Sequence, residues 1–286
     1  MTRSAWDSAP RAEPPQPRRS PWYRGAVSGD DEGSASAPGV SNVAGISGFP
    51  SVLGAPGSPR AWGLFEIGFR PWLRRQLAGI HLAGVDDAAA AIQANPSAAG
   101  APVVFVANHT SWYDGFLLRE VHRRLRPASP LRSIMLHAEL SRSRTLRWIG
   151  GTSLDPDRPA TLRGALRELD ALRDQGVVIS FFPQGRIFPA TRRPLGFRPG
   201  VRLVLRRLAP VTVLPVAIHL EMGNLPRPTA WILAGTPEWI PGHRAGEGMT
   251  AVGAEALDER VGDLLDRIQG LLCAHGEGTG AHWPPS

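Results

Sequence analysis

The sequence predicts an α/β fold in which a central, mostly parallel mixed sheet is flanked by helices. Continuous apolar runs at 103–107 and 177–182 are typical of strands that are buried on both faces of a sheet. Between them, leucines recur at helical spacing across 160–174, and the glycine at position 176 suits the end of a helix. Strands that alternate with helices in this way favour a largely parallel sheet covered by helices.

The remaining elements follow in the same alternating order. Strands are predicted at 80–82, 103–107, 132–136, 177–182, 211–220 and 230–234. Helices are predicted at 116–125, 146–149, 160–174, 200–208 and 254–274. We expect Pro215 to interrupt the 211–220 strand, because proline has no backbone N–H to donate to a neighbouring strand.

The two ends of the chain differ in composition from the middle. Residues 1–59 are dense in Pro, Gly, Ser and Ala with little periodicity, which predicts a disordered segment. We expect one folded domain over 60–275 and a flexible tail over 276–286.

The first part of the expected domain, 60–79, places Trp62 and Trp72 among arginines. This pattern is typical of amphipathic helices lying in a membrane interface, and equally of a helix packed on its own domain. Pro71 predicts two shorter helices or a kink.

Composition restricts the chemistry and the location. Cys273 is the single cysteine, so one chain can form neither a disulfide nor a cysteine-based zinc site, and a reducing compartment is expected. No apolar run is long enough to cross a bilayer, and the start of the chain lacks the apolar core of a secretory signal. These features predict a protein that is either soluble or peripheral to a membrane, and of the two we expect a peripheral protein at the cytoplasmic face of a membrane.

Positive charge is concentrated in the span between Asp174 and Glu221 and in a second basic zone over 119–147. The net charge is +7, and every basic side chain apart from histidine is an arginine. No acidic residue lies between Asp174 and Glu221, although this span holds Arg186, Arg192, Arg193, Arg198, Arg202, Arg206 and Arg207. Such a cluster indicates an anionic partner: a phosphate-bearing ligand, an anionic membrane surface or a nucleic acid. Nucleic acid is the least favoured of the three, because no nucleic-acid-binding motif accompanies the charge.

The most informative segment is the end of the 103–107 run, where Asn108 and His109 are followed by Asp114. On a regular helix two side chains five positions apart diverge, but in a turn between a strand and a helix they can meet. An imidazole held by a carboxylate is the minimal general base for activating a hydroxyl. The alternative is a histidine that only caps the turn.

Four segments occur in an order that resembles the glycerolipid acyltransferase family, the His-x4-Asp enzymes that include 1-acylglycerol-3-phosphate acyltransferases. They are 108–114 (NHTSWYD), 150–158 (GGTSLDPDR), 182–186 (FPQGR) and 213–218 (VLPVAI). The resemblance covers about 62–272 and implies a single domain of that family's fold.

The resemblance also implies a mechanism and a set of site residues. It makes His109 the general base and Asp114 its partner, for direct transfer of an acyl group from an acyl-CoA or acyl-carrier-protein thioester to a lipid hydroxyl. No bound cofactor or metal is implied. Residues expected at the substrates are Asn108, Gln184, Gly185, Arg186 and Arg158. Arg186, Arg192, Arg193 and Arg198 are further candidates for the phosphates of coenzyme A or of phosphopantetheine.

Two segments depart from the family's pattern. Glutamate is usual at the place of Gln184, Arg186 stands where a small hydroxyl residue is usual, and Ile187 stands where arginine is usual. In the second segment the nearest basic residue is Arg158, two positions after the expected place. Because a displaced guanidinium need not reach the same oxygens, the acceptor can be a lysophospholipid-like lipid or, alternatively, a glycolipid or glycosylated carotenoid. A second alternative is a non-catalytic lipid- or membrane-binding protein with this fold.

Overall fold

The structure is a computed structural model. It describes residues 57–135, 140, 144–153, 167–168, 170–171, 173, 175–224, 226–242, 253–276 and 283. Several sequence-based predictions fall outside these residues: nearly all of the disordered 1–59 segment, Arg158, much of the 160–174 helix and most of the 276–286 tail.

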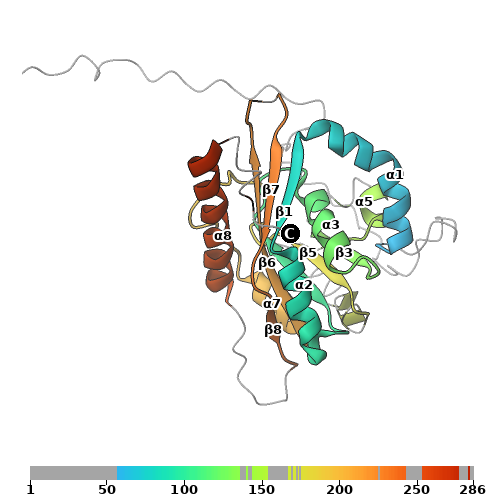
Figure 1. The fold of residues 1–286 in the computed structure, drawn as a ribbon. Coiled ribbons are helices and arrows are strands. Elements are labelled where there is room, and N and C mark those ends of the chain that lie inside the picture. The colour runs from blue at the N-terminus through green and yellow to red at the C-terminus, as the bar shows by residue number, and fades with distance from the viewer. Residues whose placement is uncertain are drawn as a thin grey trace, which may run out of the picture. The chain divides into compact units, whose positions relative to one another are not determined.

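Among the described residues, eight strands form one sheet, and β1 lies at one edge of it. Figure 1 labels β1 and the main helices. The strands are β1 (Gly79–Ala83), β2 (Val103–Ala107), β3 (Leu131–Met135), β4 (Gly151–Ser153), β5 (Val178–Phe181), β6 (Val211–Glu221), β7 (Thr229–Ala234) and β8 (Glu238–Ile240). Their order is β1-β7-β6-β2-β5-β3-β4, with β8 also paired to β6. Strand β6 runs antiparallel to β7 and β8, and the other pairs are parallel. The predicted α/β fold with a mostly parallel mixed sheet is confirmed.

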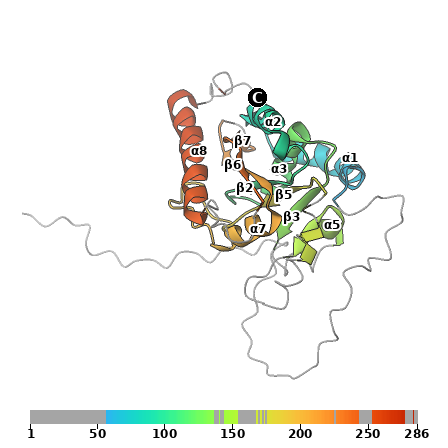
Figure 2. The same ribbon diagram turned by 90° about the horizontal axis from the view of Figure 1, so that it is seen from below.

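Helices cover both faces of the sheet, as the view from below shows (Figure 2). One face carries α1 (Pro59–Gln76), α2 (Val85–Ala94) and α3 (Asp114–Leu125), and the other carries α7 (Gly200–Leu208) and α8 (Ala254–His275). The short elements α5 (Arg144–Trp148) and η2 (Pro96–Ala98) lie in connections. Alternate residues of β2 join the two cores: Phe105 packs with the first set of helices and Val106 with the second. No helix in the described part of the chain is long and apolar enough to cross a membrane.

Two prolines lie inside continuous elements. The expectation of two shorter helices over 60–79 is wrong, because α1 continues through Pro71 as one helix. The other expectation for Pro71, a kink, agrees with the bend of α1 in Figure 1. The carbonyl that loses its donor belongs to Ile67, which is 74% exposed, so water can replace the lost bond. The expected interruption at Pro215 is also wrong. Strand β6 is continuous, and Pro215 lies between the residues that pair with β8 and those that pair with β7.

A buried polar network ties α1 to α3. Arg119 donates from Nε to Glu66 at 2.7 Å and from Nη1 to His122 Nδ1, and His122 Nε2 lies 3.1 Å from the carbonyl oxygen of Ser129. The His122 imidazole is fully buried. Burial, together with the neighbouring Arg119 charge, lowers the pKa of His122 from 6.5 to about 3.

This network predicts that the protein loses stability in mild acid. Between pH 6.5 and about 3 the unfolded chain binds a proton at His122 that the folded chain does not. The free energy of unfolding should therefore fall by about 1.4 kcal/mol for each pH unit lowered in this window. Urea titrations at pH 7.5, 6.0 and 5.0 measure the slope. The variant His122→Asn, which keeps an acceptor and a donor, should flatten it, and an unchanged slope would contradict the assignment to His122.

Candidate active site

The site begins at the carboxyl end of β2, which is buried along its whole length. Asn108 follows directly, and its side-chain amide is hydrogen-bonded to the backbone of the neighbouring strand β6. Its Oδ1 accepts from the N–H of Ile218 and its Nδ2 donates to the carbonyl of Ile218, both at 2.8 Å. Both ends of this amide are bonded to Ile218 and the residue is 1% exposed, so Asn108 has a structural role here, and its contact with substrate stays a prediction. Asn108 fixes the strand end from which His109 projects.

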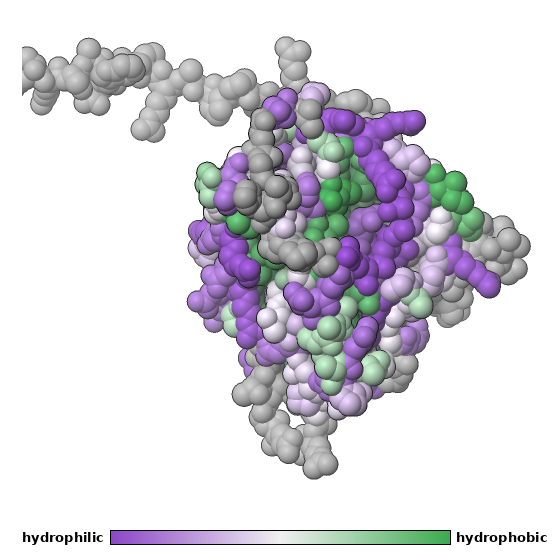
Figure 3. Space-filling view, in the orientation of Figure 1, coloured by the Kyte–Doolittle hydropathy of each residue, from purple (hydrophilic) through white to green (hydrophobic). Residues whose placement is uncertain are grey.

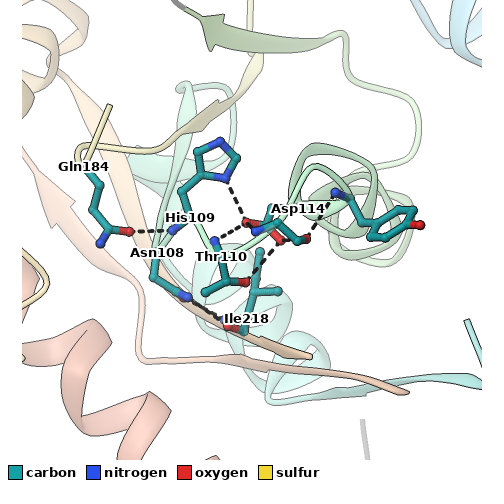
Figure 4. A network of polar contacts seen from close by, with 8 residues as sticks. Asn108, His109, Thr110, Asp114, Gln184 and Ile218 are labelled. Atoms are coloured by element: carbon teal, nitrogen blue, oxygen red, sulfur yellow. Dashed lines mark hydrogen bonds and ion pairs between the residues drawn. The ribbon is translucent and has the colours of Figure 1, made fainter. Parts of the chain in front are cut away.

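His109 and Asp114 face each other across the turn that joins β2 to α3 (Figure 4). The Nδ1 atom of His109 lies 2.8 Å from Oδ2 of Asp114. The same carboxylate, at the first residue of α3, accepts the backbone N–H groups of Thr110 at 2.6 Å and Ser111 at 2.9 Å, and both hydroxyls of these residues. These four donors fix the orientation of the carboxylate, so the turn holds it against one nitrogen of the imidazole.

The ring of His109 is accessible to solvent, although its partner Asp114 is fully buried. Asp114 has no exposed surface, whereas 24% of the His109 side chain is exposed. The imidazole stacks on the ring of Phe182, with centroids 4.5 Å apart and planes at 22°. With Nδ1–H directed at Asp114, the lone pair of Nε2 is the basic position. The pair therefore meets the geometric requirement for a general base.

Gln184 supports the backbone of this turn. Its Oε1 accepts the N–H of His109 at 2.6 Å, and its Nε2 donates to the carbonyl of Leu195 at 2.9 Å. The side chain is 3% exposed. Both ends of the amide are thus bonded within the protein, and the contact with substrate expected for Gln184 stays a prediction. Gln184 positions His109.

Beyond Phe182, residues 183–199 form a loop that is hydrogen-bonded to the His109 turn and to α8. The N–H of Phe188 donates to the carbonyl of His109 at 2.9 Å. Asp258 of α8 accepts three consecutive backbone N–H groups, at 2.6–2.8 Å, from Leu195, Gly196 and Phe197. Asp258 was not found from the sequence. No local motif marks it, because it acts on a segment about sixty residues away.

The other predicted site residues lie in the same loop. Gly185 has φ +68°, a conformation that favours glycine, and the guanidinium of Arg198 lies 3.4 Å from where a Cβ would stand. Arg186 is exposed, with its Cζ 5.8 Å from the ring centroid of Phe188. Arg192 stacks closer on that ring, at 3.8 Å. The structure thus brings His109, Asp114, Gln184, Gly185 and Arg186 into one region, while Arg158 lies outside the described residues.

A comparison with protein families matches the family model named Acyltransferase to residues 90–219. The chain contains an acyltransferase-family domain. The matched segment runs through β2, the His109 turn, Gln184 and most of β6, so it includes the whole candidate site except Asp258. No curated protein matches the sequence. In the described part of this acyltransferase domain, no three His, Cys, Asp or Glu side chains are grouped so that they could hold a metal ion.

The structure gives a physical reason for glutamine where glutamate is usual. A glutamate at position 184 could accept from His109, but it could not donate to the carbonyl of Leu195. Gln184→Glu should lower the free energy of unfolding by about 1–3 kcal/mol, because it sets a carboxylate against a buried carbonyl. It should also lower kcat, since the side chain that accepts the His109 N–H is no longer anchored to the carbonyl of Leu195.

The matched control is Gln175→Glu, which makes the same change at an exposed glutamine bonded to Ala171. Urea unfolding and initial rates of both variants test the prediction. Equal, small effects of the two substitutions would show that the Gln184 bridge has no special role.

Proposed function

We propose that this acyltransferase domain moves a fatty acyl group from an acyl-CoA or acyl-carrier-protein thioester to the hydroxyl of a lipid acceptor. The observation that carries the proposal is the contact between the exposed imidazole of His109 and the buried, multiply bonded carboxylate of Asp114. A protein that only binds lipid has no need of a histidine oriented in this way.

The reaction follows from the orientation of the pair. His109 Nε2 takes the proton of the acceptor hydroxyl as the oxygen attacks the thioester carbonyl, and Asp114 stabilises the imidazolium that forms. The C–S bond then breaks, the new ester keeps the acyl carbon, and the proton on His109 passes to the departing thiolate. This direct transfer requires no acyl-enzyme.

The loop arginines support a phosphate-bearing substrate. Within the described residues, Arg186, Arg192 and Arg198 take part in no ion pair, whereas Arg193 is paired with Asp266. They lie on the loop whose backbone is bonded to His109, so a phosphate of the donor or of the acceptor would meet unneutralised guanidinium groups close to the reacting atoms. A sugar hydroxyl on a glycolipid remains the alternative acceptor.

A peripheral membrane position is supported by the outer face of α1. Its inner face packs on the core through Trp62 and Leu73, while Leu64, Ile67 and Trp72 are 42%, 74% and 37% exposed. Trp112, 59% exposed and next to the His109 turn, meets Trp72 at a ring-centroid distance of 5.9 Å. The exposed face of α1 and the His109 turn would thus approach the cytoplasmic surface of a membrane together.

The membrane proposal predicts a loss of vesicle binding when this face is made polar. Ile67→Asn should weaken binding to vesicles of phosphatidylglycerol and phosphatidylcholine by about fivefold, because about 1 kcal/mol of apolar burial is lost. The control is Met222→Asn, at another exposed apolar residue (57%) on a different segment. Co-sedimentation measures both, and equal losses would contradict a specific role for α1.

The experiment for the activity is product identification by mass spectrometry. Purified protein is incubated with palmitoyl-CoA and, separately, with lysophosphatidate, lysophosphatidylglycerol, monoacylglycerol and a glycolipid. A new ester together with a stoichiometric free thiol is the expected result, and the reactive acceptor names the substrate. Vesicle binding without any ester, with either CoA or carrier-protein donors, would favour the non-catalytic alternative.

A further inference from the structure

A hollow of about 360 Å³ lies between α1 and the edge strand β1. In Figure 3 it is seen as an apolar floor between these two elements, bordered on the α1 side by hydrophilic side chains. Its lining comes from α1, the start of β1 and Glu120 of α3, and includes none of His109, Asp114 or Gln184. It is therefore a site apart from the one that carries out acyl transfer.

The floor of this groove is aliphatic. It is lined by Leu73 of α1, by Leu77 just after the end of that helix, and by Ile80 and Leu82 of β1. Leu73 and Leu77 are each 3% exposed. Because β1 ends the sheet, no further strand covers this side of the floor within the described chain. A hollow of this volume with an aliphatic floor suits an alkyl chain.

The rim of the groove carries an excess of positive charge. Arg70 and Arg74 line it, with Glu120 as the only acidic lining residue. The Nε of Arg70 lies 3.5 Å from Glu120 Oε1 and, although buried, has no hydrogen-bond partner among the described residues. A buried donor without a partner is costly, and an anionic oxygen would satisfy it. Two guanidinium groups against one carboxylate favour an anionic head group over a neutral one.

We propose that this groove binds a single-chain amphiphile with an anionic head group. The alkyl chain lies on Leu73, Leu77, Ile80 and Leu82, and the head group contacts Arg70 and Arg74. Glu120 is six residues, or about 9 Å along α3, from Asp114, so the bound lipid lies near the acyl-transfer site without occupying it. The head group is a carboxylate, as in a fatty acid, or a phosphate, as in a lysophospholipid.

Equilibrium binding of monomeric 12-carbon probes tests the proposal without requiring turnover. Laurate and lauroyl lysophosphatidate should both bind more tightly than dodecanol, and the tighter of the two identifies the head group. In Arg70→Gln/Arg74→Gln the affinity for the anionic probes should fall by about tenfold or more, because charge-assisted bonds are lost. Leu82→Phe, which fills the floor and keeps the charge, should weaken all probes.

The matched control is Arg75→Gln, an exposed arginine of the same helix that does not line the groove. It should leave the affinities unchanged. Equal losses in Arg75→Gln and in the double variant would overturn the proposal, as would affinities that the double variant and Leu82→Phe leave unaltered. Loss of binding in His109→Ala would also overturn it, because the probe would then occupy the acyl-transfer site. Binding that persists in a catalytically inactive protein supports the groove independently of the proposed activity.

Discussion

Replacing His109 by alanine is expected to lower kcat by about 10²–10⁴-fold, the range that a positioned general base contributes. The imidazole is the accessible member of the pair, with Nδ1 fixed on Asp114, so its removal takes away the proton acceptor. The backbone bond from the His109 N–H to Gln184 does not depend on the side chain. The thermal midpoint should therefore change little. Thiol release from palmitoyl-CoA at saturating acceptor measures the rate.

His275→Ala is a suitable control, because His275 is the last residue of α8 and is not near the site residues in the chain. Its activity should equal that of the unaltered protein. Should His109→Ala also retain full activity with its fold intact, the proton would have to be removed by another group, and the mechanism proposed for the domain would be wrong.

Asp114→Asn is expected to have the second largest effect, and a different signature. The Asp114 carboxylate accepts from His109, two backbone N–H groups and two hydroxyls, whereas an asparagine offers a single accepting oxygen. One of these buried donors would face an NH₂ group, which should cost about 1–3 kcal/mol of stability. The imidazole would also lose its anionic partner, so kcat should fall by about 10²-fold or more.

The two substitutions can therefore be separated by measuring both urea unfolding and kcat. His109→Ala should affect kcat alone, and Asp114→Asn should affect kcat and stability together. An Asp114→Asn variant that is destabilised but fully active would show that this carboxylate only shapes the turn, and that orientation of the imidazole does not depend on it.

Much of the fold follows from local sequence. Strands β2 and β5 lie in apolar runs of the sequence, and in α7 and α8 apolar residues recur at helical spacing. The local pattern of apolar residues is therefore enough to predict these four elements. Helix α2 was not predicted, because its inner residues include alanines that make a weak apolar stripe. Strands β4 and β8 are three residues each, too short for a periodic pattern.

In the candidate site, too, the sequence predicts what is local in the chain and misses what depends on distant partners. The His109 and Asp114 pair lies within one turn, so its spacing is visible in the sequence. The roles of Asn108 and Gln184 depend on partners far along the chain, Ile218 and Leu195, and a polar residue beside a motif cannot be assigned to substrate or to scaffold without them. The bonds from Asp258 to the 183–199 loop and the groove between α1 and β1 depend on tertiary packing in the same way.

The central claim is that His109 activates the acceptor hydroxyl for direct attack on the thioester. Rapid-mixing measurement of thiol release from acyl-CoA, with and without acceptor, tests it most directly. The claim predicts that thiol appears only when acceptor is present, in step with ester, and at least about a hundredfold more slowly in His109→Ala. A stoichiometric burst of thiol without acceptor, or a rate that His109→Ala leaves unchanged, would contradict it.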